Sequence, residues 1–458
     1  MANSVLANDA VLAIASANDF EVHFRAIADA LQGAVAAGER FTAWYEAESS
    51  DFVRLNRAKV RQAGRVTQQS IAVRLIRGAR HAQHTLTLSG DLAADIAQAT
   101  ASLGGLRGAL PDLADDPHLL LPDTVTNSRH VVDGALPPSA EAVGQVLDAA
   151  GGDDLVGIYA AGPVARGFAN SEGQRNWHAV TTYNLDFSLH HRADKAVKSM
   201  LAGFAWSADE LRAKMHAARE QLALVTREPR TLAPGRYRVW LAPSAMEEIA
   251  SLLRWGGFSG RAMATRQSAL ARMRDGQKLS PMVTLAEDYA TGVAPTFQAE
   301  GFTRPERIPL IEAGALAASL VSPRTAREFD LAANGANAWE APEALSMAGG
   351  GLPERDALAA LDTGLAIGNL WYMNYSDRVA CRMTGMTRFA TFWVEGGRIV
   401  APVNVLRFDD TLFRMLGDNL EALSVEPELM LSPESYYSRR LASVRMPGAL
   451  LSELAFTL

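Results

Sequence analysis

The stretch that decides the fold of the second half of the chain is VWLAPSAMEEIASLLRW, residues 239–255. It begins with an apolar run that is typical of a strand and continues into a segment with helical spacing. Ile249, Leu252 and Leu253 recur three and four residues apart, so they form one apolar stripe of a helix over residues 244–256. A strand followed at once by an amphipathic helix predicts a packed α+β unit at this point.

Two adjacent carboxylates, Glu247 and Glu248, lie near the start of this helix. Paired acids after a strand can serve acid–base chemistry or metal ligation. Ser244 and Glu247, however, stand in the S-x-x-E relation of a capping box, which stabilises a helix start by about 1 kcal/mol. Glu248 falls on the outer face of the predicted helix, where a negative charge suits the helix dipole. We therefore interpret both acids as structural residues of a capped helix.

The rest of the chain mixes strands and helices without a regular βαβ repeat, which predicts an α+β fold of two domains. The segment EPRTLAPG, residues 228–235, carries two prolines, a glycine and no apolar periodicity, so it marks the boundary. We predict an N-terminal α+β domain over residues 1–230 and a strand-rich C-terminal domain over residues 231–458.

Local patterns predict elements of the first domain. FTAWYEA and DFVRLNR are rich in aromatic and β-branched residues and predict strands over residues 41–47 and 51–57. SAEAVGQVLDAA predicts a helix over residues 139–150. Another helix begins after Ser207, which has Glu210 three residues on and so suits a cap.

Composition and charge exclude several classes of protein. The 458 residues carry 51 acidic and 44 basic side chains, and the net charge of −7 argues against a nucleic-acid binder. A single cysteine, Cys381, cannot form a disulfide framework, so we expect a reducing, cytoplasmic location. The apolar run of residues 10–15 is short and no basic residue precedes Arg25, so we expect no signal peptide. No apolar run reaches the roughly 20 residues that a membrane span needs.

Five stretches spread over nearly the whole chain resemble the TldD/PmbA family. They are LVGIYAAGPVARGFANSEG, GRYRVWLAPSAMEEIASLLRWGGFSGRAMATRQSAL, FQAEGFTRPERIPLIEAGAL, RMTGMTRFATFWVEGGRIVAPVNVLRF and MPGALLSELAFTL. The order and spacing of all five carry the resemblance. It implies a two-domain fold whose C-terminal domain dimerises and encloses a central cavity.

One branch of that family is a zinc peptidase with an H-E-x-x-x-H helix and a further cysteine ligand near the C-terminus. When the sequences are aligned without a gap from Val239 onward, the two His and the Glu of the motif fall at Ser251, Gly256 and Leu252. The cysteine falls near SPESYY, residues 432–437, which contains no Cys. Zinc binds imidazole, thiolate or carboxylate, so these vestigial positions predict no metal site.

The distribution of histidines supports the same prediction without an alignment. The last histidine is His216, so residues 217–458 offer no imidazole, and a site of carboxylates alone would suit Mg or Ca rather than zinc. The chain therefore resembles the TldE/PmbA branch, which pairs with a TldD-like metal-bearing homologue to form a peptidase for unfolded peptides. The resemblance implies that zinc and the general base belong to that partner and that this chain needs no cofactor.

Residues 371–388 form the most chemically dense segment. The resemblance implies that this neighbourhood faces the cavity, and its candidates are Trp371, Asn374, Arg378, Arg382, Thr384 and Arg388. Aromatic and arginine side chains beside free sheet edges suit the capture of an extended peptide. The alternative is that the aromatic residues belong to the core and the arginines pair with acids such as Asp377.

Two other functions stay open. A stand-alone enzyme of different chemistry would use Cys381 or the 371–388 cluster, although no histidine follows Cys381 to serve as its base. A non-enzymatic, peptide-binding homodimer would need no H-E-x-x-x-H chain. The histidine pairs His81/His84 and His190/His191 point to opposite faces of strands, so we interpret them as structural.

Overall fold

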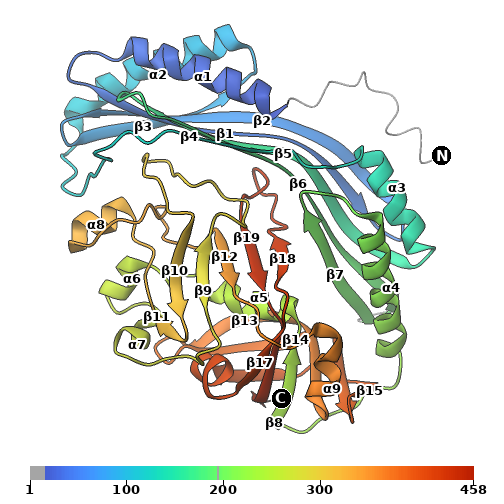
Figure 1. The fold of residues 1–458 in the computed structure, drawn as a ribbon. Coiled ribbons are helices and arrows are strands. Elements are labelled where there is room, and N and C mark those ends of the chain that lie inside the picture. The colour runs from blue at the N-terminus through green and yellow to red at the C-terminus, as the bar shows by residue number, and fades with distance from the viewer. Residues whose placement is uncertain (1–15, 193–194, 458) are drawn as a thin grey trace.

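The computed structural model describes residues 16–192 and 195–457. The apolar run of residues 10–15 lies outside the described residues. Within the described part, no helix is long and apolar enough to cross a membrane. The chain forms a two-domain, sheet-rich fold with both helices and strands, which confirms the predicted α+β class (Figure 1).

A long curved sheet dominates the first half of the chain. Its strands are β1 (Arg40–Leu55), β2 (Val60–Arg77), β3 (Arg80–Leu88), β4 (Ser128–Val132), β5 (Asp154–Asn170), β6 (Arg175–Arg192) and β7 (Lys195–Gly203). Their order is β3-β2-β1-β5-β6-β4, and β7 also pairs with β6. Within the described residues of this sheet, β4 and β6 form the one parallel pair. Figure 1 shows this sheet arching over the elements of the second half.

Strand β1 runs unbroken through residues 48–51, where the sequence predicted a break between two strands. Pairing with β2 continues there, with Ser49 opposite Thr67 and Ser50 opposite Val66. Glu48, Ser49 and Ser50 are each only 1% exposed. Glu48 accepts a hydrogen bond from the Arg439 amide at 3.0 Å, and the Ser50 hydroxyl accepts one from the Arg439 guanidinium group. The Ser49 hydroxyl pairs with that of Thr67 on β2 at 3.0 Å. The prediction of two strands was wrong, since Arg439, which bonds to Glu48 and Ser50, lies far away in the sequence.

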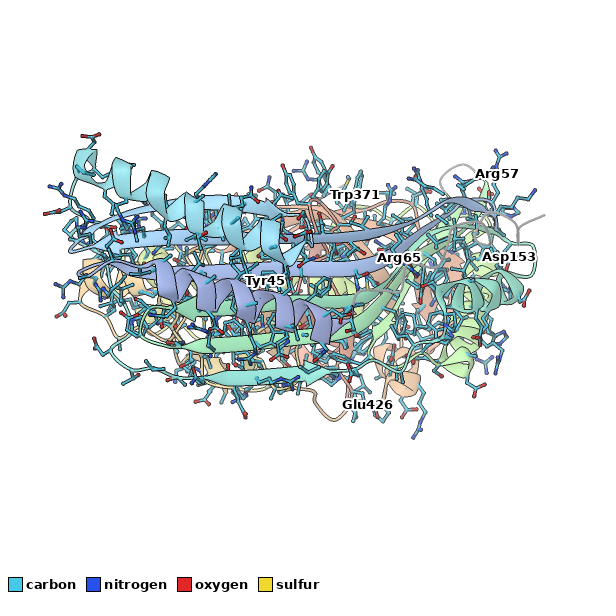
Figure 2. All side chains as sticks on the ribbon, turned by 90° about the horizontal axis from the view of Figure 1, so that it is seen from above. Tyr45, Arg57, Arg65, Asp153, Trp371 and Glu426 are labelled. Atoms are coloured by element: carbon cyan, nitrogen blue, oxygen red, sulfur yellow. The ribbon has the colours of Figure 1, made fainter. Side chains whose placement is uncertain are left out.

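Helices pack against both ends of the long sheet. They are α1 (Ala17–Ala34), α2 (Leu92–Ala109) with the short 3-10 turn η2 (Leu110–Asp112), α3 (Ser139–Ala150) and α4 (Ala208–Val225). Figure 2 looks onto α1 and α2 from above, with the buried Tyr45 of β1 beneath them; its ring centroid lies 5.3 Å from that of Phe24. The helix expected over residues 139–150 is confirmed. So is the cap of α4, where the Ser207 hydroxyl accepts a hydrogen bond from the Glu210 amide at 3.2 Å.

The second half contains two further sheets. The first has the order β11-β10-β9-β12-β19-β18. Its strands are β9 (Leu285–Asp288), β10 (Arg307–Glu312), β11 (Ala315–Leu316), β12 (Ala344–Met347), β18 (Glu428–Leu431) and β19 (Ser443–Met446). The second has the order β13-β8-β20-β16-β14-β15, with β17 beside β20, and β13 also pairs with β14, which closes five strands into a ring. Its strands are β8 (Gly235–Leu241), β13 (Gly364–Asp377), β14 (Arg382–Glu395), β15 (Arg398–Pro402), β16 (Arg407–Thr411), β17 (Leu420–Leu423) and β20 (Ala449–Phe456).

The helices of this half are short. They are α5 (Pro243–Leu253), α6 (Gly260–Ala264), α7 (Ala271–Arg274), α8 (Pro323–Phe329) and α9 (Ala357–Leu361), with the turns η3 (Glu354–Asp356) and η4 (Arg414–Asp418). The sequence predicted a strand-rich domain here, and the pattern of short helices between strands agrees with it.

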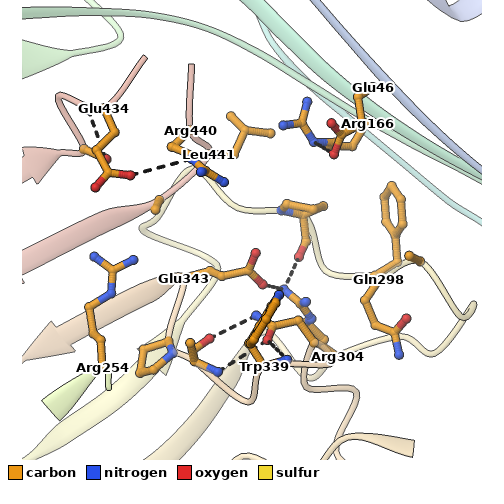
Figure 3. A pocket seen from close by; sticks show the side chains of 18 of the residues that line it. Glu46, Arg166, Arg254, Gln298, Arg304, Trp339, Glu343, Glu434, Arg440 and Leu441 are labelled. Carbon is orange, nitrogen blue, oxygen red and sulfur yellow. Dashed lines mark hydrogen bonds and ion pairs between the residues drawn. The ribbon is translucent and has the colours of Figure 1, made fainter. Parts of the chain in front are cut away.

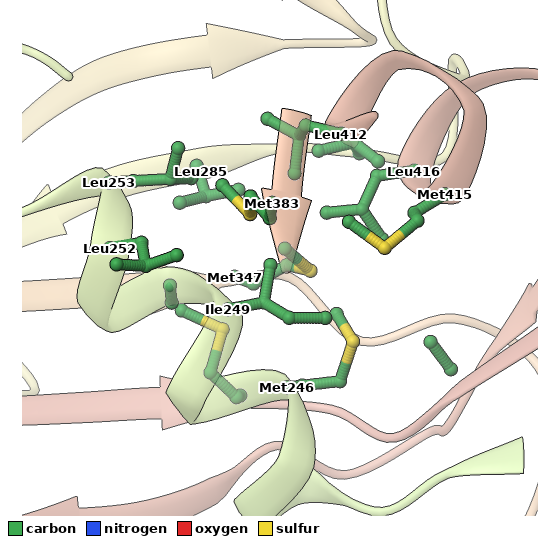
Figure 4. Packing of buried hydrophobic residues seen from close by; sticks show 14 of the residues in the cluster. Met246, Ile249, Leu252, Leu253, Leu285, Met347, Met383, Leu412, Met415 and Leu416 are labelled. Atoms are coloured by element: carbon green, nitrogen blue, oxygen red, sulfur yellow. The ribbon is translucent and has the colours of Figure 1, made fainter. Parts of the chain in front are cut away.

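Helix α5 is buried along the apolar stripe that the sequence predicted. Ile249, Leu252 and Leu253 are 1–2% exposed. Figure 4 shows them packed with Met246 against residues of the neighbouring strands and turns, among them Leu285, Met347, Met383, Leu412, Met415 and Leu416. Burying one such side chain contributes about 1.5–3 kcal/mol, so the stripe anchors α5 firmly in the core.

The predicted capping box at the start of α5 is wrong. The helix begins at Pro243, its N-cap is Ala242, and no side chain caps it. Strand pairing extends to the cap residue itself, because the Ala242 amide donates to the Ile367 carbonyl at 3.0 Å. Proline is favoured at the first helical position, where no amide proton is needed. The helix therefore starts one residue before Ser244, which leaves both Ser244 and Glu247 inside the first turns.

Candidate functional site

A cleft lies between the long sheet and the second half of the chain. Its volume is about 620 Å³. Strands β1 and β5 form one wall, the end of α5 forms the floor, and three loops complete it. The lining includes Trp44, Glu46, Arg166, Ser251, Arg254, Trp255, Phe297, Gln298, Arg304, Trp339, Glu343, Ser432, Glu434, Arg440, Leu441 and Ala442 (Figure 3). We call this space the interdomain cleft.

A second pocket of about 320 Å³ adjoins the interdomain cleft along α5. Both spaces are lined by Ser251, Arg254, Ser432, Glu434 and Ala442, so they are continuous. The second pocket, here the α5 pocket, is further lined by Lys198, Ser199, Met200, Ser244, Glu247, Glu248, Asn369, Met430, Leu431, Pro433, Ser443 and Val444. Helix α5 thus presents its apolar stripe to the core and a polar stripe to the two pockets.

The two adjacent acids of α5 belong to that polar stripe. The expectation that Glu248 lies on the outer face is wrong, because both carboxylates are half-buried and line the α5 pocket. Burial raises the pKa of Glu247, against the charges of Arg254 and Lys198. Burial and the neighbouring Glu247 raise the pKa of Glu248 to about 7. A pair of acids of this kind resists carrying two negative charges unless a cation lies beside it.

Most cations of the interdomain cleft are paired. Arg166 is buried, and its Nε lies 3.3 Å from Glu46 Oε1, which also accepts a hydrogen bond from Trp44 Nε1 at 2.9 Å. Arg304 is buried as well, and its Nη1 lies 2.6 Å from Glu343 Oε2. These two ion pairs fix the side chains that form the wall of the cleft. Each pair has no net charge.

Behind the Arg304–Glu343 pair lies a fully buried carboxyl group, Glu287 of β9. Its Oε1 accepts hydrogen bonds from the amides of Glu343 at 2.5 Å and Ala344 at 2.8 Å. Its Oε2 has no hydrogen-bond partner among the described residues. Burial raises the pKa of Glu287 to about 7, although the two amide bonds favour the charged form. This carboxyl group therefore changes its charge near neutral pH.

The second half of the sequence matches a known family. A family model described as the PmbA/TldA metallopeptidase C-terminal domain covers residues 234–458. The chain belongs to the TldD/PmbA family. It is therefore related to metallopeptidases, and the sequence resemblance is confirmed. A search of curated proteins finds no match.

Solved structures extend the family likeness to the first half of the chain. TldE from Thermococcus kodakarensis is 13% identical, with a TM-score of 0.73 over 95% of this chain and 100% of that chain. A candidate modulator of a DNA gyrase from Thermotoga maritima MSB8 is 14% identical, with a TM-score of 0.73 and the same coverage. Another from Bacteroides thetaiotaomicron VPI-5482 is 14% identical, with a TM-score of 0.72 over 95% of this chain and 98% of that chain. At these identities the likeness shows the fold.

The residues at the family's zinc motif do not fit a zinc ion. Ser251 lines both pockets, but its hydroxyl group is not among the usual zinc ligands. Leu252 is 2% exposed and belongs to the core, so a side chain there points away from the pockets. Gly256 follows the end of the helix with a φ of +78°. Across residues 16–192 and 195–457, no group of three His, Cys, Asp or Glu side chains is arranged to hold a metal ion.

The predicted cavity residues cluster on the β13–β14 hairpin. None of the six lines the interdomain cleft or the α5 pocket. The Arg388 guanidinium lies 4.4 Å from the ring centroid of the half-exposed Trp371, and Arg382 pairs with Asp409 at 2.9 Å rather than with Asp377. Asn374 is exposed, Thr384 donates a hydrogen bond to the Phe408 carbonyl, and Arg378 bonds to the Trp255 carbonyl. Their role in a cavity between subunits stays a prediction.

Cys381 lies in an environment that does not favour nucleophilic chemistry. The thiol is fully buried, and burial raises its pKa to about 12. A reactive cysteine needs the opposite shift, because the thiolate is the nucleophile. Among the histidine pairs, His81 bonds to Asp116 at 3.2 Å, and no metal group forms around either pair in the described part of the chain.

Sequence reasoning missed most of the lining of the interdomain cleft. Arg166 and Arg304 lie within stretches that carried the family resemblance, yet nothing in their local pattern distinguished them. Trp339 and Arg440 lie in irregular loops. The cleft joins segments that are more than 100 residues apart, so no spacing rule could have brought them together.

Proposed function

We propose that this chain is the metal-free, non-catalytic subunit of a TldD/TldE-type metallopeptidase. It completes the wall of the substrate cavity and helps to hold unfolded peptide. A TldD-like homologue supplies the zinc ion and the general base. The assembly is a heterodimer formed in the cytoplasm, a location that the single cysteine supports.

One observation carries this proposal. The face of α5 that lines the pockets has Ser251 at the position of the family's first zinc-binding histidine, while Leu252 and Gly256 replace the other motif residues. Residues 217–458 contain no imidazole from which a substitute site could be built. A peptidase reaction of the family's type therefore needs ligands from another polypeptide.

The pockets have properties that suit the holding of a peptide. They combine aromatic side chains, several arginines and acids, and unpaired strand edges. An extended peptide gains affinity from main-chain hydrogen bonds at such edges and specificity from side-chain pockets. The hairpin candidates, Trp371 and Arg388 among them, would add to the same cavity if the partner closes over them.

The proposal is tested by comparing the purified chain with its complex with an H-E-x-x-x-H homologue. We expect the chain alone to bind no stoichiometric zinc by elemental analysis and to cleave no unfolded peptide. The complex should bind one zinc per homologue and cleave. Tight stoichiometric zinc together with cleavage by the chain alone would contradict the proposal.

A cysteine variant separates the proposal from a stand-alone enzyme. We expect Cys381→Ala to leave cleavage by the complex unchanged, because the buried thiol takes no part in it. Loss of cleavage by a variant that still folds and still binds the homologue would favour the thiol chemistry instead. Persistence of the chain as a homodimer when mixed with the homologue would favour the non-enzymatic alternative.

A further inference from the structure

The polar stripe of α5 is charged oppositely at its two ends. Glu247 and Glu248 stand in its middle turns, Ser251 follows, and Arg254 stands at its C-terminal end. All four line the α5 pocket. A ligand lying along this stripe therefore meets two carboxylates at one end and a guanidinium group at the other.

In the described part of the chain the two carboxylates have no direct partner, although the charges of Lys198 and Arg254 act on Glu247 from a distance. Among the described residues, the side-chain carboxylate of neither Glu247 nor Glu248 forms a hydrogen bond or an ion pair. The cation across the pocket is Lys198 of β7, and its Nζ is already 3.1 Å from Asp186 Oδ2. Half-buried carboxylates without a partner are costly to keep charged, so this end of the pocket is suited to a cation from a ligand.

The guanidinium group of Arg254 is likewise available. Within residues 16–192 and 195–457 its side chain forms no ion pair and no hydrogen bond. The other arginines of the adjoining cleft are paired: Arg166 with Glu46, Arg304 with Glu343, and Arg440 with Glu434 at 3.7 Å. In Figure 3 the Arg254 side chain extends into the open space of the cleft with no dashed line to a neighbour. A planar fork of this kind binds a carboxylate well.

The opposite wall of the pocket consists of strand edges. Lys198, Ser199 and Met200 are consecutive in β7, and all three line the pocket. Since side chains alternate along a strand, three consecutive lining residues place the pocket at the strand's edge. Among the strands of residues 16–192 and 195–457, β7 pairs with β6 alone, and β18, which contributes Met430 and Leu431, pairs with β19 alone. Main-chain groups at such edges are matched by the main chain of a peptide.

The separation of the two charges sets the length of the ligand. Arg254 lies six positions after Glu248 and keeps helical backbone angles. At about 1.5 Å per helical residue the two positions lie about 9 Å apart along the axis. An extended peptide advances about 3.3 Å per residue, so about three residues span that distance.

We propose that the α5 pocket binds a short free peptide of about three residues by its two charged ends. Its α-ammonium group lies at Glu247 and Glu248, its α-carboxylate lies at Arg254, and its backbone faces the edges of β7 and β18. This inference rests on the proposed peptide-holding role and narrows it: the chain recognises free termini rather than the middle of a long unfolded chain.

Calorimetric titration of the full-length chain with trialanine tests the inference. Two blocked forms of the peptide provide the comparison. One is acetylated at its N-terminus, and the other is amidated at its C-terminus. We expect trialanine to bind and each blocked form to bind about tenfold more weakly or worse, because each loses one charge-assisted contact. Equal affinity for free and blocked peptides, or no binding of trialanine, would overturn the inference.

Two variants assign the two ends. Glu248→Gln should remove most of the preference for a free N-terminus, and Arg254→Met should remove most of the preference for a free C-terminus. Arg355→Met is the matched surface control, because its side chain is 85% exposed and lies outside both pockets, and it should change neither preference. Circular dichroism confirms that each variant is folded.

The outcome is separable from that of the proposed function. Equal binding of free and blocked peptides would contradict recognition of the termini but would not contradict the subunit role. The subunit role is tested separately, by the zinc content of the complex and by its cleavage of peptides. Zinc binding and cleavage by the chain alone would contradict the subunit role. The titrations would still show whether the chain recognises the free termini of a peptide.

Discussion

A single carboxyl group, Glu287, illustrates how burial changes the behaviour of one residue. It sits on β9 directly behind the Arg304–Glu343 pair of the interdomain cleft and is 0% exposed. Two backbone amides bond to one of its oxygens, while the other has no hydrogen-bond partner in the described part of the chain. Because desolvation outweighs the two amide bonds, the pKa of Glu287 rises to about 7.

This pKa predicts a specific dependence of stability on pH. Above its ordinary pKa of 4.5 the unfolded chain releases the proton, but the folded chain keeps it until about pH 7. The folded state then binds more protons, so the contribution of Glu287 to stability is full below about pH 4.5 and is lost as the pH rises to about 7. Glu287→Gln should make the free energy of unfolding less dependent on pH. Between pH 5 and pH 8 the variant should be more stable than the parent chain by on the order of 1–3 kcal/mol.

Thermal unfolding of both proteins at several pH values measures this difference. The glutamine side chain can still accept the two amide hydrogen bonds, so the comparison isolates the charge. Parallel pH profiles for the parent chain and the variant would show that Glu287 does not titrate in this range.

Among the secondary-structure elements, helices α4 and α5 carry the same S-x-x-E pattern at their starts, but the serine caps the helix only in α4. Ser207 and Glu210 precede α4, and Ser244 and Glu247 open α5, both in the S-x-x-E relation. The Ser207 hydroxyl caps α4, whereas α5 starts earlier, at Pro243, and leaves Ser244 in its first turn. The difference comes from β8, which runs directly into α5 and fixes where the helix must begin.

The two serines therefore respond differently to the same substitution. We expect Ser207→Ala to destabilise the protein by about 1 kcal/mol, because the Glu210 amide loses its acceptor. Ser244→Ala should change stability by less than about 0.5 kcal/mol, since no capping bond is lost. Thermal unfolding of the two variants provides the measurement. A larger loss of stability for Ser244→Ala would indicate that Ser244 caps α5 after all.

At the scale of the whole molecule, the 432–442 segment joins the two halves. Arg439 is 7% exposed and inserts beneath the long sheet. Its guanidinium group donates to the Gly162 carbonyl at 2.9 Å and to the Thr182 hydroxyl at 2.7 Å, and its backbone amide donates to Glu48 at 3.0 Å. The segment lines both the interdomain cleft and the α5 pocket, so this anchor also fixes the shape of the site.

Loss of this anchor should weaken the contact between the halves. We expect Arg439→Met to lower stability by more than about 2 kcal/mol, because buried carbonyl groups lose their donor. It should also speed proteolytic cleavage within residues 432–442. Arg440→Met is the control, since its side chain is 53% exposed and its ion pair with Glu434 is long, at 3.7 Å. The control should cost less than about 0.5 kcal/mol.

Calorimetry and limited proteolysis of the two variants measure these effects. Equal stability of Arg439→Met and Arg440→Met would show that the segment is not anchored by the buried arginine.

The α+β class, the apolar stripe of α5, the cap of α4 and membership of the TldD/PmbA family could all be predicted from the sequence. Each of these depends on periodicity, neighbouring residues or the order of motifs, which are local or linear properties of the chain. The vestigial positions Ser251, Leu252 and Gly256 could also be identified directly, because the sequence alone shows that none of these residue types carries an imidazole, thiol or carboxyl group.

The way in which distant segments meet could not be predicted from the sequence and became visible in the three-dimensional structure. The tertiary structure made β1 continuous through a polar stretch, moved the start of α5 to Pro243, turned Glu248 toward a pocket, and joined Arg166, Arg304 and Arg440 around one cleft. The physical reason is the same in each case. Burial and pairing partners come from residues far away in the sequence, and desolvation then sets which polar groups are neutralised and which remain available to a ligand.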